Sequence, residues 1–171
     1  MTVILINDEP EGLVKAVADS KKRFNKMIMD ELSSSSTARL IVGVLDDSPL
    51  KVGVLIFDAE FDSMYQPPSI LEGKTKDYDG GVALVRADSP MKLKGVTLPM
   101  GISLIHELGH AKQFVERPIW FEALFRKIVQ ANFSGTRTTL PEKYEIEDQN
   151  VTYHEKPVCK ELGFPFRDKY D

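Results

Sequence analysis

Residues 106–110 read His106-Glu107-Leu108-Gly109-His110, and this motif constrains the fold more than any other part of the chain. Residues four apart on an α-helix lie on one face, one turn above the other. On a helix, both imidazoles therefore reach one metal ion, while the carboxylate of Glu107 projects beside them. Neutral imidazole is a good Zn²⁺ ligand, and a nearby carboxylate can take a proton from a zinc-bound water. The motif predicts a zinc site with His106 and His110 as ligands and Glu107 as the acid–base residue.

The residues around the motif favour a helix. Pro99 stands where the first helical residue is expected, and apolar residues then recur at helical spacing. Gly109 lowers the stability of such a helix by about 1 kcal/mol relative to alanine. We therefore expect another backbone segment to pass close to Gly109.

The third ligand is not given by the motif. A catalytic zinc takes three protein ligands and keeps a fourth position for water. A third histidine six residues after His110 would complete one known pattern, but position 116 is Glu116. A carboxylate from a second helix is the other arrangement, and Pro141 begins a helical pattern in an acidic stretch. The candidates there are Glu142, Glu145, Glu147, Asp148 and Glu155, with His154 as a more distant possibility.

Composition limits the classes of partner and compartment. The chain has 171 residues, 42% hydrophobic and 28% charged, which fits a single domain spanning residues 1–171. Its formal net charge is −4, so we expect no nucleic-acid partner and no anionic membrane, since both need a basic face. Cys159 is the single cysteine, which excludes a disulfide framework, fits a reducing compartment and argues against a cysteine-based structural zinc.

The pattern of apolar and turn residues predicts an α+β fold. The expected elements are strands at 3–6, 39–45, 52–57 and 82–85, and helices at about 10–32, after Pro99, after Pro118 and after Pro141. A serine run at 33–36 should end the first helix, and residues 59–80 read as a loop-rich stretch. The apolar residues after Pro118 predict a core helix, with a substrate-binding wall as the alternative; they are Trp120, Phe121, Leu124, Phe125, Ile128 and Val129.

Two blocks of the sequence resemble the zincin-like metallopeptidases found among bacterial type III secretion effectors and toxin domains, the NleD-like family. The first block runs from His106 to Ala111. The second contains, in chain order, Glu147-Asp148, Val151, Glu155, Glu161-Leu162-Gly163, Arg167 and Tyr170. The chain departs from the family pattern at two positions, because Lys156 replaces an asparagine and Cys159 stands where an arginine is usual.

The resemblance implies a zincin-like fold, with an N-terminal helix and a small sheet followed by an active-site helix and C-terminal helices. It also implies Zn²⁺ as cofactor. His106 and His110 match the family's metal ligands, and Glu107 matches its catalytic residue. Asp148 matches the third metal ligand, with Glu147 as the close rival.

Further expectations follow from the same resemblance. Tyr170 and Arg167, which belong to the second matching block, are candidates for stabilising the oxyanion of a tetrahedral intermediate, with a structural clamp at the C-terminus as the alternative. The activity would be that of an endopeptidase acting on a protein or peptide substrate, with host-cell signalling proteins, including protein kinases, as targets. The protein would be soluble, and either cytosolic or secreted into a host cell by a route that needs no signal peptide.

Two alternatives stay open at this point, and the oligomeric state is not indicated by the sequence. One is a catalytically silent zincin-fold interaction module, motivated by Lys156 and Cys159. The other is a zincin whose cleft is blocked by its own C-terminal tail.

Overall fold

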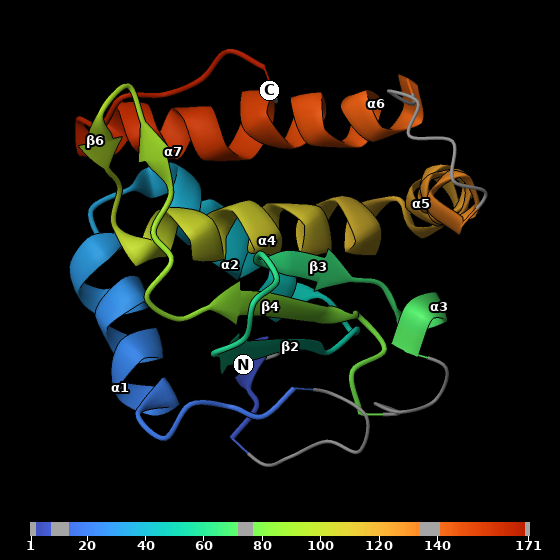
Figure 1. The fold of residues 1–171 in the computed structure, drawn as a ribbon, viewed down its shortest axis with the longest axis horizontal. Helices are drawn as coiled ribbons and strands as arrows, with labels where there is room; N and C mark the ends of the chain where they lie inside the picture. Colours follow the sequence, from blue (N-terminus) through green and yellow to red (C-terminus); the bar gives the residue numbers. More distant parts are fainter. Residues whose placement is uncertain (1–2, 8–13, 72–76, 134–140, 170–171) are drawn as a thin grey trace.

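The computed structural model of the protein describes residues 3–7, 14–71, 77–133 and 141–169 (Figure 1). The elements in chain order are β1 (Val3–Leu5), α1 (Ser20–Asn25), η1 (Lys26–Glu31), α2 (Ser36–Asp47), β2 (Val52–Phe57), β3 (Met64–Gln66), α3 (Pro68–Leu71), β4 (Val82–Arg86), β5 (Lys92–Leu93), β6 (Val96–Thr97), α4 (Met100–Glu116), α5 (Pro118–Phe133), α6 (Pro141–Asn150), η2 (Val151–Glu155) and α7 (Lys156–Leu162). The segments η1 and η2 are π-helical. The mixture of helices and small sheets confirms the α+β class. Within the described residues, no helix combines the length and apolar composition needed to cross a bilayer.

Four strands form one sheet in the order β1-β2-β4-β3. β1, β2 and β4 run parallel, whereas β3 pairs antiparallel with β4 at one edge. All six residues of β2 are buried, as expected for a strand that is covered on both faces. Val54 and Ile56 pack in the larger apolar cluster, with the helices, while Leu55 and Phe57 pack in a smaller cluster. Because side chains alternate along a strand, the two clusters lie on opposite faces of the sheet.

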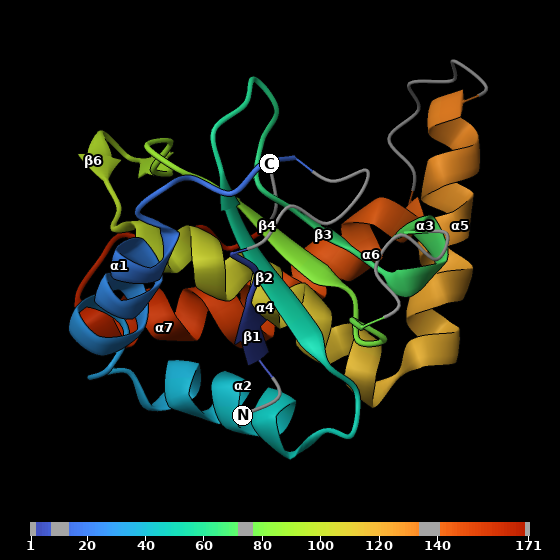
Figure 2. The same cartoon turned by 90° about the horizontal axis from the view of Figure 1, so that it is seen from below.

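The helices cover the sheet in layers, with α4 in the middle. In Figure 1, α4 lies over the sheet, and α6, η2 and α7 form a nearly continuous rod on the far side of α4. Figure 2 shows α5 standing beside α3 and α6 at one end of the molecule. Every residue of α4 from Gly101 to Ala111 is buried. Such a helix is a central element of the core, and its polar residues must find partners inside the protein.

Several predicted elements are confirmed. The strands at 3–6, 52–57 and 82–85 correspond to β1, β2 and β4, and the helices after Pro99, Pro118 and Pro141 correspond to α4, α5 and α6. The stretch at 59–80 also contains β3 and α3, which the sequence did not indicate.

The helix predicted at about 10–32 begins only at Ser20. Part of that prediction, residues 8–13, lies outside the described residues. Just before the helix the chain pairs with the sheet, since the N–H of Val17 donates to the carbonyl of Ile56 at 2.9 Å. This pairing overrides the helical periodicity of the apolar residues. The chain is then helical to the end of η1, and a serine-rich turn follows, as predicted.

The strand predicted at 39–45 is wrong, because this segment belongs to α2. Ser35 caps the helix, with its hydroxyl accepting the N–H of Ala38 at 3.0 Å. Ala38, Ile41 and Leu45 are buried at spacings of three and four residues, so one helical face packs against the core. The β-branched composition that suggested a strand is a weaker preference than this packing.

Glu161, at the end of α7, ties that helix to the N-terminus of α2. Its carboxylate accepts hydrogen bonds from the hydroxyls of Ser35, Ser36 and Thr37 at 2.6, 2.8 and 2.7 Å, and from the N–H of Thr37 at 3.0 Å. These donors, with that of Ser35 first, lower the pKa of Glu161 to about 2. The ionised carboxylate thus serves as an N-terminal helix cap supplied from a distant part of the chain.

We predict that Glu161→Gln lowers the free energy of unfolding at pH 7 by about 1 kcal/mol, an ordinary value for an N-terminal cap that solvent partly screens. The pKa of Glu161 is lowered on folding, so its contribution is present at neutral pH and is lost as pH falls toward 2. In urea unfolding, the difference in unfolding free energy between wild type and variant should therefore become smaller as the pH is lowered. Glu60→Gln, at an exposed position, is the control. An equally large loss of unfolding free energy in Glu60→Gln, or a loss in Glu161→Gln that does not change with pH, would contradict this role.

Candidate metal centre

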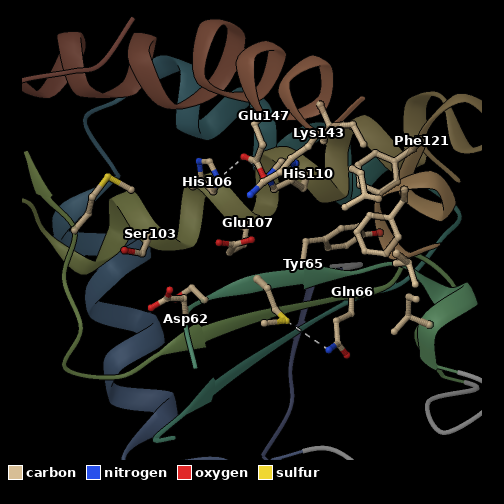
Figure 3. A pocket seen from close by; sticks show the side chains of 18 of the residues that line it. Asp62, Tyr65, Gln66, Ser103, His106, Glu107, His110, Phe121, Lys143 and Glu147 are labelled. Atoms are coloured by element: carbon tan, nitrogen blue, oxygen red, sulfur yellow. Dashed lines mark hydrogen bonds and ion pairs between the residues drawn. The ribbon is translucent and has the colours of Figure 1, made fainter. Parts of the chain in front are cut away.

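The two histidines of the motif lie on one face of α4. The ring centroids of His106 and His110 are 4.9 Å apart, and the rings are nearly perpendicular, at 89°. Each histidine is 6% exposed. Both line a cleft of about 920 Å³ whose walls include residues of α4, α5, α6 and β3. Figure 3 shows Glu107 on the same helix, directed into this cleft beside the imidazoles.

Glu147, on α6, faces both histidines. Its Oε2 lies 3.3 Å from Nε2 of His106 and 3.3 Å from Nε2 of His110 (Figure 3). Ligand atoms of these three residues all lie within 4.8 Å of one another, a spacing that allows them to hold one metal ion. Two imidazole nitrogens and one carboxylate oxygen therefore meet at one point of the cleft.

The surroundings of Glu147 fit a cation at this point. Its Oε2 is buried and makes no hydrogen bond within the described part of the protein. A buried carboxylate oxygen without a hydrogen bond is costly, and a metal ion bound between it and the two Nε2 atoms would remove that cost. Two neutral imidazoles and a carboxylate are a ligand set of catalytic zinc sites, which leave one position open.

Asp148, the ligand implied by the resemblance, is not part of this group, whereas its rival Glu147 is. The reason is helix geometry, because consecutive residues of an α-helix point about 100° apart. Ile146, directly before Glu147, and Asn150, three residues after it, are buried and both make hydrogen bonds with α4. The orientation that they impose on α6 turns Glu147, rather than Asp148, toward the cleft.

The remaining acidic candidates are accounted for in other ways. Glu145 accepts a hydrogen bond from the indole Nε1 of Trp120 at 3.2 Å. The side chain of Glu142 lies outside the described residues. His154 is buried behind α4, where its Nδ1 pairs with Oδ1 of Asn150 at 2.8 Å. Neither Glu145 nor His154 is among the residues that line the cleft.

Each histidine is oriented by a second contact at its other ring nitrogen. Nδ1 of His106 lies 2.8 Å from Oε2 of Glu155, and Nδ1 of His110 lies 2.9 Å from Oε1 of Gln113. Gln113 is itself fixed, because its Nε2 donates to the carbonyl of Ile146 at 3.0 Å. Acceptors at both Nδ1 atoms place the hydrogen there and leave the Nε2 lone pairs for a metal. The sequence did not indicate Gln113, and it suggested Glu155 only as a possible ligand.

Arg167 lines the cleft, but its guanidinium is bound to Glu155. Its Nε and Nη2 donate to the two oxygens of that carboxylate at 2.8 and 2.7 Å. This two-point contact holds the carboxylate of Glu155 behind His106, as expected for a structural clamp; the oxyanion role suggested by the resemblance stays a prediction. Tyr170, the other residue suggested for the oxyanion, lies outside the described residues. The hydroxyl of Tyr65, a tyrosine in the cleft wall, donates to the carbonyl of Gly80 at 2.7 Å.

The pKa values of His106 and Glu147 depend on each other. Burial alone would lower the pKa of His106, but the carboxylates of Glu147 and Glu155 outweigh it and raise the pKa to about 10. Burial would raise the pKa of Glu147, but His110 and His106 lower it well below its usual range. A proton on His106 therefore balances the buried carboxylate of Glu147. A divalent cation would provide the same balance and would release that proton.

Glu107 differs from Glu147 in its electrostatics. Burial raises the pKa of the Glu107 carboxyl, although the charges of His106 and His110 oppose this effect. A carboxyl group that is buried, faces an open cleft and holds its proton more readily than usual is suited to exchange a proton with a water molecule in that cleft.

Gly109 permits the close approach of the C-terminal helices to α4. A Cβ atom at this position would lie 2.0 Å from Oδ1 of Asn150 and 3.0 Å from Nδ1 of His154. The Nδ2 of Asn150 also donates to the carbonyl of His106 at 2.8 Å. Close approach at Gly109 was expected, but side chains of Asn150 and His154 fill the space, where a backbone segment had been expected.

We predict that Glu147→Gln lowers zinc affinity by at least about a hundredfold, because the charged ligand is lost, while the isosteric change Asp148→Asn changes it by less than about threefold. Competition with a chromophoric chelator measures both affinities, and circular dichroism confirms that each variant is folded. A larger loss for Asp148→Asn than for Glu147→Gln would restore Asp148 as the ligand.

The candidate centre thus consists of two imidazoles and a carboxylate from α4 and α6, with Glu107 beside them and Glu155 and Gln113 behind them. It lies at the wall of a cleft that is wide enough for a bound molecule. Comparison of the chain with protein-family models, curated proteins and solved structures found no match.

Proposed function

We propose that the protein is a zinc-dependent endopeptidase with a zincin-like fold. The observation that carries the proposal is the buried Oε2 of Glu147, which lies 3.3 Å from the Nε2 atoms of both histidines at the wall of an open cleft. His106, His110 and Glu147 would hold the ion. Bound zinc would supply Lewis acidity toward a water molecule and toward the carbonyl of the substrate.

Glu107 is the residue proposed to move the protons. It follows His106 directly on α4, is buried and is directed into the cleft (Figure 3). Its carboxylate would take a proton from the attacking water and return it to the nitrogen of the leaving amine. A group that performs both transfers must lie within hydrogen-bond reach of the water and of the scissile bond, and a position beside the two ligand histidines meets that condition.

The edge strand β3 supports a peptide as the substrate. Among the residues that the structure describes, β3 pairs with β4 alone, and residues 62–66 line the cleft. An extended peptide can add to such an edge through main-chain hydrogen bonds, which do not depend on the peptide's sequence. A substrate bound in this way would run past Glu107 and the two histidines, which line the same cleft.

The resemblance to the zincin-like effector family suggests the biological target. An effector or toxin protease of this kind would act on host-cell signalling proteins, after secretion by a route independent of a signal peptide. Support for this part of the proposal comes from the two sequence blocks alone.

The alternative of a catalytically silent interaction module gains no support from the positions that motivated it. Lys156 pairs with Asp168, and Cys159 is fully buried, with its thiol pKa raised to about 12 by burial. Neither residue is among those that line the cleft. In the described part of the tail, Asp168 pairs with Lys156 and Arg167 pairs with Glu155.

We predict that the zinc-loaded protein cleaves an unfolded test protein, such as reduced and alkylated casein, and that Glu107→Gln lowers the rate by about a hundredfold or more while zinc content stays near that of wild type. Mass spectrometry of the fragments gives the rate, and metal analysis gives the zinc content. Glu116→Gln is the matched control, because Glu116 lies on the same helix, outside the cleft, and pairs with Lys112.

Retained activity in Glu107→Gln would remove Glu107 from its proposed role. A wild-type protein that binds zinc tightly but cleaves no substrate would instead favour the interaction module.

A further inference from the structure

The two ends of the cleft differ in chemistry. Asp62 and Ser103 lie at one end, and Phe121 and Tyr65 lie at the other, with the metal ligands between them (Figure 3). The first end thus offers a carboxylate and a hydroxyl, whereas the second offers aromatic surface.

The apolar end is built from one face of α5. Phe121, Phe125, Ile128 and Val129 line the cleft at spacings of four, three and one residues, which places them on one side of the helix. Phe121 is fully buried, while the other three are only partly buried. Partly buried apolar side chains at the wall of a cavity leave apolar surface that a ligand can cover.

This apolar wall begins directly at the metal centre. The ring of Phe121 contacts the imidazole of His110 edge-on, with centroids 6.4 Å apart. Phe125 stacks on Phe121 at 5.9 Å and 14°, and Tyr65 meets Phe121 edge-on at 5.6 Å. A group held against Phe125 would therefore lie next to whatever is bound at His110.

We infer that the apolar end of the cleft is a specificity subsite for a large apolar side chain of the substrate, with aromatic side chains preferred, next to the bond that is cleaved. This inference deepens the proposed function and rests on it. An aromatic ring is favoured because it can stack on, or meet edge-on, the rings already present. Helix α5 therefore has two roles, since Phe121 belongs to the core and Phe125, Ile128 and Val129 form the wall of the cleft.

The test compares two ligands that differ only in this side chain. N-acetyl-phenylalanine hydroxamate and N-acetyl-alanine hydroxamate both bind zinc through the hydroxamate group, so calorimetry with the zinc-loaded protein isolates the effect of the phenyl ring. We expect the phenylalanine compound to bind at least about tenfold more tightly, within the range for apolar pockets. Phe125→Asp should reduce this preference to less than about threefold.

Val129→Asp is the second variant, because Val129 does not stack on the core ring Phe121 and its replacement is less disruptive to folding. Gln130→Ala, at an exposed position of α5, is the matched control and should leave the preference unchanged. Equal affinity of the two ligands, or a preference that survives in both Phe125→Asp and Val129→Asp, would overturn the inference.

The outcomes separate this inference from the proposed function. Cleavage of casein with no preference for apolar residues beside the cut would overturn the subsite and leave the peptidase. Tighter binding of the phenylalanine hydroxamate by a zinc-loaded protein that cleaves nothing would support the subsite and remove the peptidase.

Discussion

The candidate metal centre depends on how closely the C-terminal helices approach α4. Gly109 has no side chain, and Asn150 occupies the space that a Cβ atom would need. From there Asn150 donates to the carbonyl of His106, which fixes the end of α6 against α4. Glu147 lies one turn earlier on α6 and is thereby brought to 3.3 Å from both Nε2 atoms. A wider separation of the helices would leave two histidines without a third ligand.

The same packing supplies the outer contacts of the site. Glu155 follows α6 in η2 and binds Nδ1 of His106, and Arg167 from the C-terminal segment holds Glu155 in a two-point contact. The motif on α4 thus provides two candidate ligands, while the last part of the chain provides the third candidate and the support of one histidine. Because metal ligands in such a site must be held in position by their neighbours, zinc binding and docking of the C-terminal helices should stabilise each other.

Part of this site follows from the sequence because helix periodicity is local. The spacing of His106 and His110 fixes their shared face, and α4 carries them as expected. The choice between Glu147 and Asp148 depends on the rotation of α6 about its axis, which is set by the burial of Ile146 and Asn150 against a helix distant in sequence. The contact of Gln113 with His110 likewise becomes visible only once α6 is in place, because the carbonyl of Ile146 orients the amide.

The fold shows the same division. The continuous apolar run of β2 predicts a buried strand, and the structure has one. The β-branched residues at 39–45 also predict a strand, but this segment is helical in α2, because one face of the helix packs against the core.

The most direct test of the account is a crystal structure of the zinc-loaded protein with an anomalous difference map at the zinc edge. We predict one peak on α4, at about 2.0–2.2 Å from Nε2 of His106, Nε2 of His110 and a carboxylate oxygen of Glu147. A peak ligated by Asp148, or zinc bound to the protein at a place that excludes the two histidines, would contradict it.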